Sequence, residues 1–83
     1  MTPAATAIAR ISDARARWRV MVQAWPEESG YRGRLVFEPD SAAAGLTAGE
    51  GPPALRGTSR EDVVGQAYAL PEQELRVMLL SLG

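Results

Sequence analysis

Residues 17–38 read RWRVMVQAWPEESGYRGRLVFE, and they carry the strongest structural signal in the chain. Both halves of this stretch alternate between apolar and other residues with the period of two that is typical of a strand with one buried face. We predict strands over Trp18–Trp25 and Tyr31–Glu38. Because Pro26–Gly30 supplies turn formers between them, an antiparallel hairpin is expected. The predicted core face comprises Trp18, Val20, Val22, Ala24, Tyr31, Gly33, Leu35 and Phe37.

Arginines fill the opposite face of the predicted hairpin. Arginine beside Trp18 or Trp25 can pair with phosphates and stack on bases, which makes nucleic-acid binding a candidate function. The other interpretation is a solvated face balanced by nearby acids, and the net charge of −1 favours it because nucleic-acid binders usually carry a clear positive charge. If the apolar faces of the two strands coincide, the arginines that lie together are Arg17, Arg19, Arg32 and Arg34.

The segments on either side of the hairpin are less regular. Residues 1–16 fit a helix that starts at Thr2 and Pro3, or a strand over Ala7–Ser12 that turns at Asp13, and we favour the strand. Residues 40–53 contain three glycines and two adjacent prolines, so we predict a mobile loop there. Residues 54–56 are long enough for a short third strand.

Two helices are predicted at the C-terminal end. Ser59 can cap the first, and Glu61 and Asp62 stand in its first turn, where the helix dipole favours negative charge. Pro71 is unfavourable inside a helix but suits a first helical position, so a break near Leu70 and a second helix from Pro71 are expected. The predicted apolar faces comprise Val63, Val64, Ala67 and Tyr68 in the first helix and Leu75, Met78, Leu79 and Leu82 in the second.

These elements predict an α+β fold, in which an antiparallel sheet of three or four strands carries the two C-terminal helices on one face. A chain of 83 residues is expected to form a single domain, residues 1–83, with a thin core. No apolar run is long enough for a membrane span and no signal-peptide pattern is present, so a cytoplasmic location is expected. The absence of cysteine agrees with that expectation.

The composition excludes most catalytic chemistry. The chain has no His, Cys or Lys, so it cannot build a Ser-His-Asp triad, a cysteine nucleophile or a Schiff base. We therefore predict that it is not an enzyme and that it uses no cofactor or metal. Glu38 and Asp40 could form a carboxylate pair for acid–base work, although a solvated strand end is the simpler interpretation. Gly45, Gly49 and Gly51 lack the Lys-Ser/Thr sequence of a phosphate-binding loop.

The last helix carries more apolar residues than one buried stripe requires. Val77, Met78 and Leu80 widen its apolar surface, so the helix is either buried on two sides or meets a partner. A homodimer seam is one expectation for so small a protein.

A second line of inference comes from residues 18–67. The hairpin, Glu38-Pro39-Asp40 and the later segment with Gly57, Ser59, Glu61, Asp62 and Ala67 resemble the HicB family of antitoxins. In that family, two strands lead to a Pro-Asp-x-x-Gly segment and a Gly-x-Thr-x-Glu-Glu-Ala-x-x-Asn-Ala helix start. Here the glycine after Pro39-Asp40 is displaced to Gly45. The resemblance implies a small α+β domain that neutralises a basic RNase toxin with acidic residues.

The sequence therefore predicts a small non-catalytic protein-binding module: an antitoxin, an inhibitor or a regulatory subunit. The alternative is a nucleic-acid-binding protein that uses the arginine-rich sheet face. The candidate binding residues are Arg17, Arg19, Trp25, Arg32, Arg34, Glu61 and Asp62.

Overall fold

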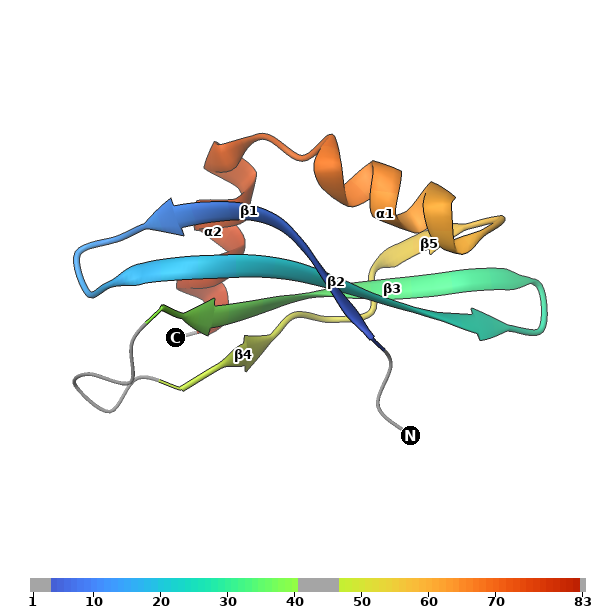
Figure 1. Ribbon diagram of the computed structural model, residues 1–83, viewed down its shortest axis with the longest axis horizontal. Helices are drawn as coiled ribbons and strands as arrows, with labels where there is room; N and C mark the ends of the chain where they lie inside the picture. Colours follow the sequence, from blue (N-terminus) through green and yellow to red (C-terminus); the bar gives the residue numbers. More distant parts are fainter. Residues whose placement is uncertain (1–3, 41–46, 83) are drawn as a thin grey trace.

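The computed structural model describes residues 4–40 and 47–82 and confirms the predicted α+β fold, an antiparallel sheet followed by two C-terminal helices (Figure 1). Within the described residues the sheet has five strands, and three of them form a continuous meander. The elements are β1 (Ala5–Ser12), β2 (Arg17–Glu27), β3 (Gly30–Pro39), β4 (Gly49–Glu50), β5 (Leu55–Gly57), α1 (Arg60–Tyr68) and α2 (Glu72–Leu82).

The sheet is antiparallel throughout, in the order β1-β2-β3-β4, with β5 also paired to β3. The two short strands share one edge of β3. Strand β5 pairs with Tyr31–Gly33, whereas β4 pairs with Val36 and Phe37. The third strand that the sequence predicted is therefore present as Leu55–Gly57.

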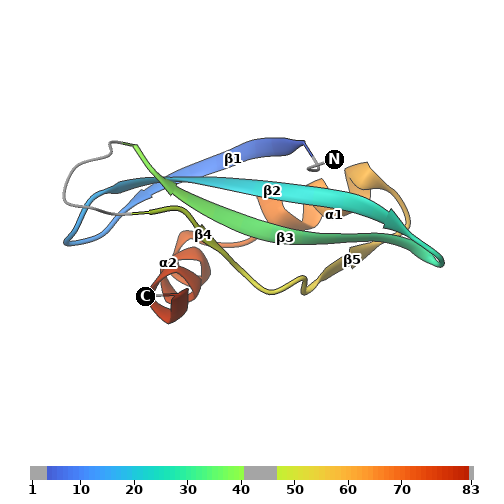
Figure 2. The ribbon, with the colours of Figure 1, turned by 90° about the horizontal axis from the view of Figure 1, so that it is seen from below.

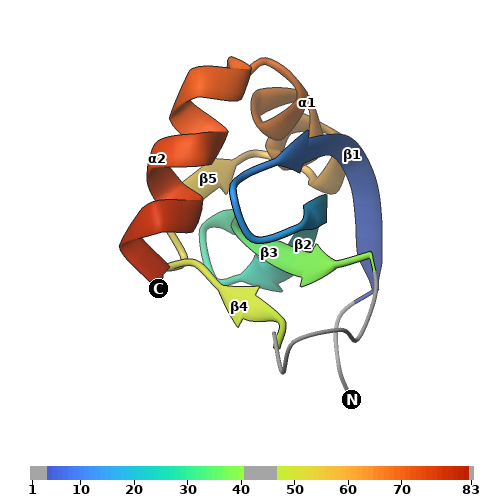
Figure 3. The same cartoon turned by 90° about the vertical axis from the view of Figure 1, so that its left-hand side faces the viewer.

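The core lies between the sheet and the two helices. The register pairs Val20 with Phe37 and Val22 with Leu35, so the predicted apolar faces of the hairpin coincide. Viewed end-on, α1 and α2 lie on the same side of the sheet (Figure 3), and we call the side that they cover the inner face. The buried core residues are Ile11, Trp18, Val20, Val22, Leu35, Phe37, Val63, Ala67, Leu75 and Leu79.

The β2–β3 turn is shorter than predicted. Strand β2 continues to Glu27 and β3 begins at Gly30, so the turn consists of Glu28 and Ser29 instead of five residues. Pro26 is a strand residue opposite Tyr31. Proline is tolerated there because the pairing of β1 with β2 ends at Ala5 and Gln23, which leaves β2 with one neighbour among the described strands.

The predicted loop over residues 40–53 is wrong at Gly49–Glu50, which forms β4. The pairing is continued by a hydrogen bond of 2.8 Å from the Gly51 amide to the Leu35 carbonyl. A Cβ atom on Gly49 would lie 3.2 Å from Leu82 Cδ1, so the end of α2 packs closely against this short strand. The rest of the loop prediction includes residues 41–46, which lie outside the described residues.

The described part of the N-terminal segment forms a strand, as favoured, whereas Thr2 and Pro3, the alternative helix start, lie outside the described residues. Strand β1 pairs with β2 along Ala5–Ser12, and a register shift between Ala7 and Ala9 marks a β-bulge. The extra residue at the bulge lets Ile8 pack against the core that Ile11 enters.

Both predicted helix starts are close to the observed ones. The Ser59 hydroxyl oxygen accepts a hydrogen bond of 3.1 Å from the Asp62 amide, as expected of an N-cap. The Pro71 carbonyl accepts from Glu74 and Leu75, so α2 begins immediately after this proline. One helix prediction is wrong. Tyr68 is 60% exposed instead of joining the core, and its hydroxyl reaches the Ala7 carbonyl of β1 at 3.4 Å.

Candidate functional site

The outer face of the sheet is the side that carries no helix (Figure 2). The four predicted arginines do share this face, but they do not form one cluster. The antiparallel register places Arg19 opposite Glu38 at one end and Arg32 opposite Trp25 at the other. Gln23, which faces Arg34, lies four positions after Arg19, so Arg19 and Arg34 are about 13 Å apart along the strands.

Carboxylates surround Arg19 at one end of the outer face. Arg19 lies 3.5 Å from Glu38 and 3.9 Å from Asp40, and Arg10 of β1 is also 3.9 Å from Asp40. Glu38 and Asp40, considered above as a carboxylate pair, are thus engaged with arginines. Arg17 is exposed and forms no ion pair with the residues that the structure describes.

Arg34 is engaged near the middle of β3. Its Nε donates a hydrogen bond of 2.7 Å to Gln23 Oε1, its Nη2 lies 3.1 Å from Glu50, and its guanidinium stacks 5.6 Å from the Trp25 ring centroid. Arg32 forms a 2.9 Å ion pair with Glu27. Surface pairs of this kind contribute little free energy, but they lower the positive potential that would attract a polyanion.

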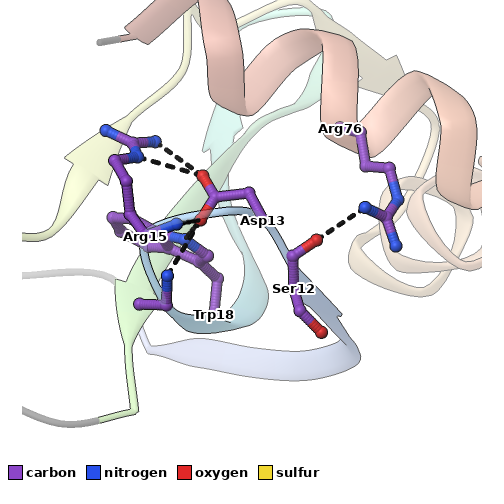
Figure 4. A network of polar contacts seen from close by, with 6 residues as sticks. Ser12, Asp13, Arg15, Trp18 and Arg76 are labelled. Atoms are coloured by element: carbon purple, nitrogen blue, oxygen red, sulfur yellow. Dashed lines mark hydrogen bonds and ion pairs between the residues drawn. The ribbon is translucent and has the colours of Figure 1, made fainter.

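Trp18 cannot act as a stacking platform because it is only 3% exposed on the inner face. It is tied to the β1–β2 turn by a hydrogen bond of 3.1 Å from its indole Nε1 to Asp13 Oδ1 (Figure 4). The same carboxylate accepts from the Arg15 and Ala16 amides and from the Arg15 guanidinium, which also stacks 5.1 Å from the Trp18 ring centroid. Desolvation acts to raise the pKa of Asp13, but these hydrogen bonds outweigh it and hold the pKa well below its usual range.

The residues that carry the HicB resemblance have local structural roles in this fold. Asp62 accepts a hydrogen bond of 2.9 Å from the Thr58 amide and so helps to cap α1. A Cβ atom on Gly57 would lie 2.7 Å from Asp62 Oδ2, so a side chain there would displace the Asp62 carboxylate from its capping position. Ala67 is buried at 1% exposure. Of the two predicted acidic binding residues, Asp62 is therefore used by the fold, whereas Glu61 is exposed on α1.

Helix α2 carries two of the exposed large apolar side chains of the described residues. Val77 is 61% exposed and Leu80 is 69% exposed, so both project away from the core that Leu75 and Leu79 enter. Beside them lies an open groove of about 530 Å³, lined by Pro71, Gln73, Glu74, Val77 and Met78. We call Val77, Leu80 and this groove the α2 surface. The sequence indicated its apolar members but not Gln73 and Glu74, because polar residues that line a groove follow no periodic pattern in the sequence.

The described residues contain neither a metal-binding cluster nor a membrane-spanning helix. Within residues 4–40 and 47–82, no group of three or more Asp or Glu residues is placed to hold a metal ion. No helix in the same part of the chain is long and apolar enough to cross a membrane.

Comparison with known proteins identifies no relative of this chain. The chain has no significant match among protein-family models, curated proteins or solved structures. The structure thus defines the class, an α+β protein with an ion-paired outer sheet face and an exposed apolar helix face, and the HicB resemblance stays a prediction.

Proposed function

We propose that the chain is a non-catalytic protein-binding module that acts as an antitoxin, an inhibitor or a regulatory subunit. The observation that carries this proposal is the exposure of Val77 and Leu80 on α2. When a partner covers exposed aliphatic side chains beside a groove, their removal from water stabilises the complex by about 25 cal/mol per Å² of apolar area.

The charge of the α2 surface indicates the chemistry of the partner. Glu74 lines the groove and forms no ion pair with the residues that the structure describes, whereas Glu72 is held by Arg76 at 2.9 Å. The last turn of α2 contains no basic residue. An apolar segment that carries a basic residue complements this surface, and a basic toxin of the kind that the HicB resemblance implies would meet that requirement.

Nucleic-acid binding through the outer face is the second candidate. The partly exposed Trp25 favours it, because aromatic rings serve as stacking platforms for bases. The ion pairs of Arg19, Arg32 and Arg34 count against it, since a polyanion would have to displace their carboxylates. The geometry therefore favours the protein-binding function.

The test is a tagged pull-down of the full chain at moderate salt, followed by affinity measurement with the purified partner. Leu80→Glu should weaken binding at least about tenfold, because a charge would be buried in the contact. Ala54→Glu is the matched control, since it adds the same charge at an exposed position away from α2. A partner that binds both variants equally, or a concentration-dependent dimer that Leu80→Glu dissociates, would refute a protein partner on this surface.

A further inference from the structure

A second pocket lies on the chain near the β2–β3 turn, away from the α2 surface. Its volume is about 90 Å³, and it is lined by Glu27 at the end of β2, Ser29 in the turn, Arg32 from β3, and Arg56 and Gly57 from β5. Since water occupies about 30 Å³ per molecule in the liquid, the pocket has room for a small oxyanion. Its lining side chains are mostly polar and charged.

The fold brings the two arginines of this pocket together through close backbone packing. Gly30 has a φ of +144°, and a Cβ atom there would lie 2.6 Å from the Gly57 carbonyl oxygen. A glycine at this position lets β5 approach the turn. Gln66 of α1 then donates a hydrogen bond of 2.6 Å to the Arg56 carbonyl, which fixes the strand. As a result, Arg56 stands directly opposite Arg32 on the sheet.

This pairing leaves a local excess of positive charge. Like charges directly opposite each other on a sheet repel, and only Arg32 is compensated, by Glu27 at 2.9 Å. The buried Nε of Arg32 has no hydrogen-bond partner among the described residues. The contact with Glu27 is therefore an ion pair without hydrogen-bond geometry. Arg56 forms no ion pair with any carboxylate in residues 4–40 and 47–82.

We propose that this pocket binds a phosphate group. Two guanidinium groups on adjacent strands offer planar arrays of donors that match a tetrahedral oxyanion, and the Ser29 hydroxyl adds a neutral donor. Trp25 is the cross-strand neighbour of Arg32, so a phosphate that carries a planar base would bring that base close to an aromatic ring. The site is independent of the α2 surface and of any protein partner there.

The test is an NMR titration of the labelled full chain with sodium phosphate at constant ionic strength. Saturable shifts of the Trp25 indole N–H and the Arg32 Nε–H signals are expected. Arg56→Gln should weaken binding about tenfold, because it removes charge-assisted hydrogen bonds. Glu27→Gln should tighten binding about threefold, because it removes a competing carboxylate at the rim.

Arg17→Gln is the matched control. It makes the same change in net charge at an exposed arginine on the same face but at the far end of β2, so the phosphate affinity should stay within about twofold. Equal weakening in Arg17→Gln and Arg56→Gln would show diffuse attraction and overturn the site, as would shifts that never saturate. A parallel titration with a mononucleotide shows whether the site recognises the phosphate group alone or a phosphate that carries a base. Tighter binding than phosphate identifies a base-bearing ligand, and equal binding identifies the phosphate alone; either result upholds the site.

Discussion

The inner and outer faces of the sheet are built from alternate residues of the same strands, but they are stabilised by different means. The inner face buries aliphatic and aromatic side chains under two helices, and Val20 and Phe37 are both fully inaccessible there. The outer face carries arginines that pair with Glu27, Glu38 and Glu50 across or along the strands. The inner face therefore supplies most of the folding free energy, whereas the outer face can change its partners at little cost.

This difference also indicates where binding can occur. The helices already cover the inner face, and ion pairs already occupy most cations of the outer face. In the described residues, the groups left without a partner include the exposed apolar residues of α2 and the Arg56 guanidinium. The two proposals made above rest on those groups, and they lie on different faces of the molecule.

The largest expected difference between the faces comes from one substitution made on each of them. Val22→Ala on the inner face should lower the free energy of unfolding by about 2–3 kcal/mol, because it leaves a cavity under the helices. Val36→Ala on the outer face should cost about 1 kcal/mol, because the neighbouring long side chains can close over the gap. Urea unfolding of both variants with unchanged m-values would measure these losses.

Val36 is itself only 8% exposed, against 1% for Val22, so burial alone does not predict a large difference. Equal losses in the two variants would show that the outer face is packed as tightly as the inner one. In that case it would be wrong to conclude that the inner face contributes more to the free energy of unfolding than the outer face.

A smaller effect is expected at Asp13, which holds Trp18 of the inner face to the β1–β2 turn. Asp13→Asn should lower the free energy of unfolding by about 1–2 kcal/mol at neutral pH, because an amide accepts these hydrogen bonds less strongly than a carboxylate. Thermal or urea unfolding of the two proteins at pH 7 would measure the loss.

The free energy of unfolding should also depend differently on pH in the native protein and in Asp13→Asn. The pKa of Asp13 is lowered in the folded state, so its contribution to stability is present above the unfolded pKa of about 4 and is lost as the pH falls toward the lower folded value. The gap between the native protein and Asp13→Asn should therefore narrow below about pH 4. A constant gap between pH 7 and pH 3 would show that the ionised carboxylate is not the stabilising form.

Much of the fold could be predicted because its signals are local. Alternation along residues 17–38 determines which side chains face the core, and Ser59 and Pro71 mark helix starts through their own hydrogen-bonding chemistry. The α2 surface was partly predictable for the same reason, since Val77 and Leu80 fall outside the stripe that contains Leu75 and Leu79.

The features that were missed depend on tertiary contacts. Strand β4 has no apolar alternation, and its position follows from pairing with Val36 and from packing against Leu82. The arginines were correctly assigned to one face, but their separation depends on the antiparallel register, which places Arg19 and Arg32 toward opposite ends. The Arg32–Arg56 pair depends on the close approach of β5 to Gly30, which no local pattern indicates.

The smallest effect is expected from the ion pairs of the outer face. Glu38→Gln removes the 3.5 Å partner of Arg19, but Asp40 remains at 3.9 Å and both side chains of the original pair are more than one-third exposed. The free energy of unfolding should fall by less than about 0.5 kcal/mol, and the difference should vanish at about 1 M salt because the charges are screened. Denaturant unfolding at low and high salt would measure it. A loss above about 1 kcal/mol that persists in salt would mean that the paired arginines are required for folding. The outer face would then be a structural surface, and its arginines would have less freedom to exchange a carboxylate for a ligand.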